Sequence, residues 1–101
     1  MHFCYCYFSL PVPPLIINRA SQTALVQGED FSFDCTSEPA NPVAVDYTFQ
    51  KDGQTVDGSR ATVQGPVLTI TSVQTAGDGG NYSCSANNSV GRDTVYHSLI
   101  G

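Results

Sequence analysis

The sequence predicts an all-β protein, a sandwich of two packed antiparallel sheets, and three observations lead to that prediction. Turn-forming Gly, Pro, Asn and Asp residues recur about every ten positions, with short β-branched and aromatic runs between them. No stretch sustains the apolar period of about 3.6 residues that marks an amphipathic helix. Cys35 and Cys84 both occupy inward positions of alternating runs. A chain of 101 residues provides one such domain.

The first strand is expected to be split in two. Pro11, Pro13 and Pro14 lack the backbone N–H that a ladder needs, so this opening segment suits the edge of a sheet. Residues 15–18 and 23–26 then carry the apolar and β-branched side chains of the two halves.

Two strands with one apolar face follow the turn at Gly28. Residues 31–35 place two phenylalanines and a cysteine on one face and polar side chains on the other. After a polar loop at residues 37–42, residues 45–50 alternate in the same way. The Asp52-Gly53 pair that comes next is a typical signal for a tight hairpin.

The second half of the chain holds further short strands. Asp57-Gly58 and Gly65-Pro66 are turn pairs that bound two edge segments, and residues 67–71 form a strand with Leu68 and Ile70 inward. Beyond a glycine-rich corner, residues 81–87 alternate with Tyr82, Cys84 and Ala86 on one face. Residues 93–100 form the last strand, and either its odd-numbered or its even-numbered side chains could face the core.

Four motifs, in order, resemble the immunoglobulin superfamily and are closest to its intermediate (I-set) branch. Residues 51–53 are K-D-G, residues 68–73 fit L-x-I-x-x-V, residues 78–84 fit D-x-G-x-Y-x-C, and residues 84–91 fit C-x-A-x-N-x-x-G. The resemblance covers nearly everything from residue 13 onward. We therefore expect an immunoglobulin-like domain over residues 13–101, with residues 1–12 as a leader or linker.

The resemblance implies a Greek-key sandwich and a set of structural roles. Cys35 and Cys84 would form one disulfide between the sheets, with the aromatic ring of Phe49 beside it. Tyr82 would form a tyrosine corner with upstream backbone. Arg60 and Asp78 would form a salt bridge at the lower end of the sandwich.

The chain departs from the family pattern in two places. Phe49 stands where the family has a tryptophan, and a smaller ring predicts looser packing on the disulfide. The spacing from Val73 to Asp78 is also one residue longer than usual, which indicates an insertion at Ala76-Gly77. The insertion is expected to alter a corner and not the fold.

The resemblance implies an extracellular or cell-surface recognition and adhesion module that binds another protein, homophilically or heterophilically. The formal net charge of −5, from four Lys and Arg against nine Asp and Glu, argues against nucleic acid or an anionic membrane as a partner. We expect no enzyme activity, no cofactor and no metal site, because no nucleophile, paired carboxylates or oxygen cluster is suitably placed. Two alternatives are an immune-type receptor domain and an intracellular muscle-type structural module.

Two triplets are acceptors for N-glycosylation: one begins at Asn81 and the other at Asn87. Alternation places both outward on one strand, on a face that also receives Asp46, Thr48 and Gln50. This face is predicted to be wholly polar and shielded by sugar, so a partner is expected at the loop ends or on the opposite sheet.

The first ten residues are apolar and aromatic and could be the remnant of a secretory signal, although they lack a basic region. Cys4 and Cys6 are too close in an extended chain to bridge without strain. With only His2 nearby, they are not expected to bind a metal.

Overall fold

The fold is taken from a computed structural model, which describes residues 10–19, 21–56 and 58–101. His2, Cys4 and Cys6 lie outside these ranges, as does Asp57 of the expected Asp57-Gly58 turn. Within the described ranges the secondary structure consists of strands and turns, without a helix. The strands are β1 (Gln22–Ala24), β2 (Phe31–Asp34), β3 (Asp46–Lys51), β4 (Gln54–Thr55), β5 (Thr62–Gln64), β6 (Val67–Ile70), β7 (Gly80–Asn87) and β8 (Arg92–Ile100).

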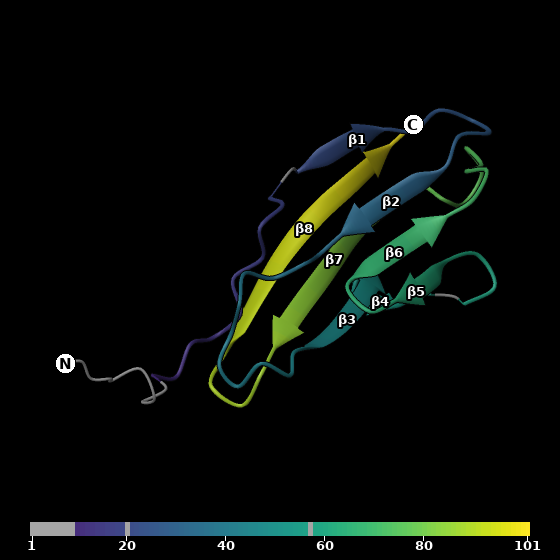
Figure 1. Cartoon of the computed structure of the whole chain (residues 1–101). Coiled ribbons are helices and arrows are strands. Elements are labelled where there is room, and N and C mark those ends of the chain that lie inside the picture. Colours follow the sequence, from purple (N-terminus) through teal and green to yellow (C-terminus); the bar gives the residue numbers. More distant parts are fainter. Residues whose placement is uncertain (1–9, 20, 57) are drawn as a thin grey trace.

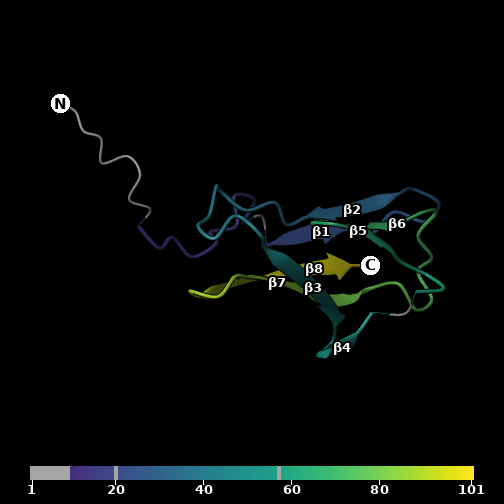
Figure 2. The ribbon, with the colours of Figure 1, turned by 60° about the horizontal axis from the view of Figure 1, so that its bottom comes forward.

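The strands form two layers. One sheet has five strands in the order β1-β8-β7-β3-β4, and the other has three in the order β2-β6-β5. Figure 1 shows the broad face of the sandwich, and Figure 2 shows β2, β5 and β6 lying above β3, β7 and β8. The chain changes sheet between β1 and β2, between β2 and β3, between β4 and β5, and between β6 and β7. The predicted all-β sandwich is confirmed.

The first strand is split, but residues 15–18 form only an isolated antiparallel bridge, between Ile16 and Ser37, in place of the predicted strand, and the second half is not antiparallel to its neighbour. Ile17 N–H donates to Thr36 O (3.0 Å), so the first half lies against the segment after β2. The second half, β1, pairs in parallel with β8, with Gln22 opposite Ser98. The expectation of purely antiparallel sheets is therefore wrong at β1, because the chain moves from one layer to the other without reversing direction.

Two tight turns join neighbouring strands where the sequence predicted them. Asp52 and Gly53 have φ angles of 51° and 82°, and this pair of left-handed residues is what a two-residue hairpin between β3 and β4 requires. Gly65 and Pro66 form the turn between β5 and β6. The turn pairs thus set the register of these hairpins.

The core lies between the sheets, and the last strand contributes its odd-numbered residues. Val95, His97 and Leu99 are buried, whereas Tyr96 is 62% exposed. The apolar core also includes Ile16, Phe31, Phe33, Cys35, Phe49, Ala61, Leu68, Ile70, Val73, Tyr82, Cys84 and Ala86. A histidine in such a place needs a polar partner, and the Thr23 hydroxyl of β1 lies 2.6 Å from His97 Nε2.

Candidate recognition surface

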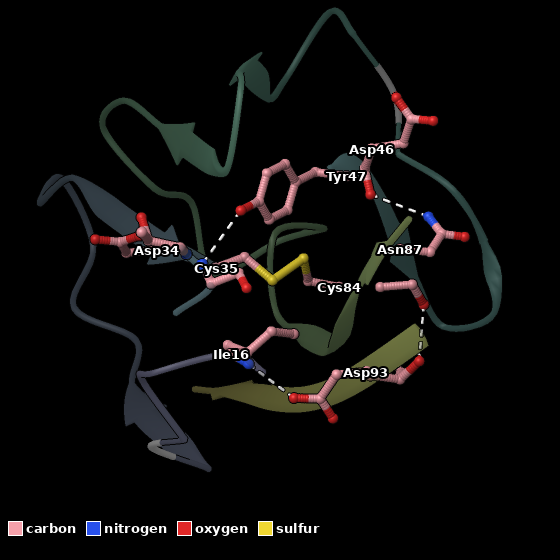
Figure 3. The surroundings of a disulfide bond; sticks show 12 residues. Ile16, Asp34, Cys35, Asp46, Tyr47, Cys84, Asn87 and Asp93 are labelled. Carbon is pink, nitrogen blue, oxygen red and sulfur yellow. Dashed lines mark hydrogen bonds between the residues drawn. A yellow bond between two sulfur atoms is a disulfide. The ribbon is translucent and has the colours of Figure 1, made fainter. Parts of the chain in front are cut away.

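The disulfide joins the two layers at the centre of the core. Cys35 directly follows β2 and Cys84 lies in β7, and the two residues are bonded with a Cα–Cα distance of 6.5 Å. Both are fully buried. The predicted inter-sheet disulfide is therefore present, and Figure 3 shows it between Ile16 and Tyr47.

Phe49 occupies the inward position of β3 beside this disulfide. It lies directly opposite Cys84 in the β3–β7 ladder and is only 5% exposed. Its ring meets that of Phe33 edge-on, with centroids 5.7 Å apart. Phe33 and Phe49 thus form an aromatic pair between the two sheets.

The corner of the sandwich between β6 and β7 is organised around the Asp78 carboxylate. Arg60 donates from Nε to Oδ1 (3.1 Å) and from Nη2 to Oδ2 (2.5 Å), and the Gln74 N–H also donates to Oδ2 (2.7 Å). The Arg60 hydrogen bonds hold the pKa of Asp78 below its ordinary value, although burial opposes them. Asp78 is therefore an ionised group that fixes the corner.

Tyr82 closes the same corner through backbone. Its buried hydroxyl donates to the Asp78 carbonyl oxygen at 2.5 Å, four residues upstream. Burial, with the nearby Asp78 charge, raises the pKa of Tyr82 to about 12. The Lys51 ammonium lies 5.9 Å from the centre of the Tyr82 ring and donates to the Gly77 carbonyl. Gly77, at the expected insertion, has a φ of 105°, a conformation that favours glycine.

The outer face of the five-stranded sheet carries a polar groove with one exposed aromatic ring, that of Tyr96. The groove has a volume of about 570 Å³, and β3, β7 and β8 supply most of its lining, chiefly Thr48, Gln50, Ser83, Ser85, Thr94 and Tyr96. Because Val95 and His97 face the core, Tyr96 must point outward. The expectation of a wholly polar face is therefore wrong at Tyr96, and the ambiguous register of β8 is the reason.

The two acceptor asparagines lie at opposite ends of this face. Asn81 is exposed and lines the groove. Asn87 is half-buried, and its amide donates to the Asp46 carbonyl oxygen at 3.0 Å, as Figure 3 shows. The two side chains that the sequence could not distinguish thus have different surroundings.

One end of the sandwich combines ordered loops with exposed apolar side chains. The Asn88 amide donates to Val12 O (3.0 Å) and Pro42 O (3.1 Å), and its carbonyl oxygen accepts from Val90 N–H (2.9 Å). Three segments distant in sequence meet there. We call this surface the loop end and define it by its exposed apolar residues: Leu10, Val12, Val43 and Val90. Sequence patterning missed it because each residue is isolated along the chain.

Leu10 and Val12 contact the domain ahead of the boundary expected at Pro13. Val12 and Asn41 exchange two backbone hydrogen bonds of 2.9 Å, and the Asn41 amide donates to Leu10 O (2.8 Å). The folded part of the described chain therefore includes these residues.

Within the described ranges, no three His, Cys, Asp or Glu side chains gather as a metal site would require. The same ranges contain no helix with the length and apolarity needed to cross a bilayer.

The family described as "Immunoglobulin domain" matches residues 14–100. The chain therefore belongs to the immunoglobulin-domain family. Its two sheets and central disulfide have the arrangement of that family's sandwich.

Particular relatives include a cell adhesion molecule and, among solved structures, an insect immune protein. The chain is 34% identical over 85 residues to the cell adhesion molecule DSCAML1 of Mus musculus, covering 77% of this chain and 4% of the relative. It is 31% identical over 83 residues to Hemicentin-2 of the same species, covering 80% and 2%. The crystal structure of the insect immune protein hemolin matches with a TM-score of 0.76 and 26% identity, covering 87% of this chain and 22% of hemolin. The chain thus spans a small part of each protein.

Proposed function

We propose that this domain is an extracellular recognition module of a multi-domain adhesion or matrix protein, and that it acts by binding a protein partner and not by catalysis. The observation that carries the proposal is the buried Cys35–Cys84 disulfide, since such bonds persist in oxidising compartments and are rare in reducing ones. Similarity to DSCAML1 and Hemicentin-2 supports it. The acceptor triplets at Asn81 and Asn87 are of the kind used in secreted proteins.

The domain is of the intermediate type in this proposal, with residues 13–101 as the module and residues 1–12 as a leader or linker whose last residues, 10–12, lie against the loop end. A split first strand and a two-residue β4 at the edge of the five-stranded sheet support that subtype. Residues 51–53 and 84–91 add the sequence motifs described above.

The partner binds at the loop end in this proposal. Val43 and Leu10 are 83% and 77% exposed, and the Asn88 hydrogen bonds hold the surrounding segments in one arrangement. A preorganised apolar surface gains more on binding than a mobile one, because less conformational entropy is lost. The domain arrangement of hemolin has implications for homophilic adhesion, so a second copy of this chain is the first partner to test.

Binding can be tested with beads coated with the full chain and mixed with one another or with cells that display candidate ectodomains. We expect aggregation or capture that Val43→Asp abolishes. Val63→Asp, on the edge strand β5 of the opposite sheet, is a matched control because Val63 is also an exposed valine. Loss of binding with Val63→Asp alone would place the partner on the opposite sheet and contradict the loop-end assignment.

Location requires its own experiment. Antibody against the domain should stain intact, unpermeabilised cells, and the native protein should carry the Cys35–Cys84 bond when analysed without reduction. A cytosolic protein with both thiols free would favour the intracellular structural module and refute the extracellular role.

A further inference from the structure

The groove on the outer face has short side chains along its floor and longer ones at its sides. Ser83 on β7 lies between Gln50 on β3 and Tyr96 on β8 in one row of the sheet. In the next row Ser85 lies between Thr48 and Thr94. The short serines in the middle strand leave the hollow of about 570 Å³. This volume lies within the range of roughly 300–1,000 Å³ that is common for small-ligand sites.

The chemistry of this groove suits a carbohydrate. Serine, threonine and glutamine side chains can donate to and accept from sugar hydroxyls. The Tyr96 ring, 62% exposed, offers an apolar face with a polar tip. The lining also includes Arg92, whose guanidinium group can donate hydrogen bonds. A site with one exposed ring among such polar groups is better matched to a sugar, which has both apolar faces and hydroxyls, than to an apolar ligand.

Asn81 supplies a covalent attachment point at the end of this groove. It begins the acceptor triplet Asn81-Tyr82-Ser83, and it is two residues from Ser83 along β7, a distance of about 7 Å. Its backbone is fixed by Asp52, whose carboxylate accepts from Asn81 N–H (2.9 Å) and whose own N–H donates to Asn81 O (2.8 Å). No described residue forms a hydrogen bond with its side-chain amide, so the amide is open to modification.

Asn87 lacks these features. Its amide nitrogen donates to Asp46 O, its side chain is half-buried, and it does not line the groove. A sugar on this nitrogen would replace one amide hydrogen next to the contact with β3. The two triplets are equivalent in sequence, and the structure distinguishes them.

We propose that Asn81 carries an N-linked glycan and that the groove holds the first sugar residues of this glycan against Tyr96. In the native protein this modification rests on the proposed extracellular location. The glycan covers the outer face of the five-stranded sheet and leaves the loop end free for a partner.

Occupancy is measured on the full chain secreted from eukaryotic cells behind an added leader, so that the result does not depend on where the native protein resides. Intact mass is compared for the wild type, Asn81→Gln and Asn87→Gln. We expect Asn81→Gln to remove the glycan mass at the groove and Asn87→Gln to retain it. Ser83→Ala, a second variant without the acceptor triplet, should match Asn81→Gln. Absence of sugar on Asn81 in the wild type would overturn the proposal.

The contact between the glycan and Tyr96 is tested by combining these variants with Tyr96→Ala. We expect the glycosylated wild type to melt about 4 °C or more above Asn81→Gln, and we expect this difference to disappear in the Tyr96→Ala background. An equal difference in both backgrounds, or no difference in either, would show that the glycan does not rest on Tyr96.

Dimers formed through an unglycosylated groove would also overturn the proposal and make the groove a protein interface. A native protein found in the cytosol would refute the proposed function and, with it, the modification of the native protein, but it would leave the result on the secreted chain unchanged.

Discussion

Arg19 and Asp93, 74 positions apart, form a paired contact that holds the N-terminal segment to the last strand. Arg19 donates from Nη1 to Asp93 Oδ2 (2.6 Å) and from Nη2 to Oδ1 (3.2 Å). Asp93 Oδ2 also accepts from the Ile16 N–H at 2.8 Å, a contact drawn in Figure 3. The carboxylate therefore fixes the point where the split first strand moves between the two layers.

Replacing this carboxylate should cost more than replacing its cationic partner. Asp93→Ala leaves the Ile16 N–H without its acceptor and releases the segment, so we expect a loss of about 1–2 kcal/mol in the free energy of unfolding. Arg19→Ala should cost less, because Arg19 is half-exposed and water can replace it. Urea unfolding of both variants checks the order.

The matched control for that comparison is Asp46→Ala, since Asp46 is an exposed carboxylate on β3 of the same sheet. It should change stability by no more than about 0.5 kcal/mol. A larger loss for Arg19→Ala than for Asp93→Ala would contradict the role given to the Ile16 hydrogen bond.

Acid should destabilise the domain through its hydrogen-bonded carboxylates. The pKa values of Asp34, Asp78 and Asp93 all lie below the ordinary 3.8, because Thr36, Arg60 and Arg19 respectively donate hydrogen bonds to them. The unfolded chain then binds protons at a higher pH than the folded chain does. The stabilisation is complete above the unfolded pKa and is lost as the pH falls through the folded values.

We therefore expect the free energy of unfolding to hold near neutral pH and to fall steeply below about pH 4. Asp78→Asn should be less stable than the wild type at pH 7 but should show a shallower decline in acid. Asp46→Asn should reproduce the wild-type profile. An Asp78→Asn curve parallel to that of the wild type would refute the contribution of Asp78.

The inward positions of most strands could be predicted from alternation alone. Phe33, Ile70 and Cys84 lie on the faces that their runs indicated, because polar neighbours left one choice. The register of β8 could not be predicted, since Val95 on one face and Tyr96 on the other are both plausible core residues. In the structure Tyr96 lies on the outer face, so an aromatic ring is added to the polar groups expected there.

Contacts between distant polar groups could not be predicted either. Asp93 and Thr23 look like ordinary surface residues in the sequence, and each acquires its role from a partner that only the fold brings near. The Arg60–Asp78 pair was expected only because the family pattern carries it. Alternation predicts which way a side chain points, but it does not indicate which residue it meets.

Removing the Tyr82 hydroxyl tests the corner directly. Tyr82→Phe leaves the buried Asp78 carbonyl without its donor, so we expect a loss of about 1–2 kcal/mol and a melting temperature lower by several degrees. Tyr96→Phe, which removes an exposed hydroxyl, should stay within about 0.5 kcal/mol of the wild type in unglycosylated protein. Equal effects of the two substitutions would show that the corner hydrogen bond contributes nothing specific.

Reduction of the Cys35–Cys84 bond should have the largest single effect on stability. The bond links residues 49 positions apart and restricts the unfolded chain, which corresponds to about 4 kcal/mol on the chain-entropy account. This is a large share of the roughly 5–15 kcal/mol that stabilises a typical domain.

Urea unfolding with and without reductant measures the effect, and the Cys35→Ala/Cys84→Ala variant should resemble the reduced wild type. Because both cysteines are fully buried, the double variant also loses some packing, so it should be somewhat less stable than the reduced protein. A loss below about 1 kcal/mol on reduction would mean that the Phe33–Phe49 core holds the two sheets together without the covalent bond.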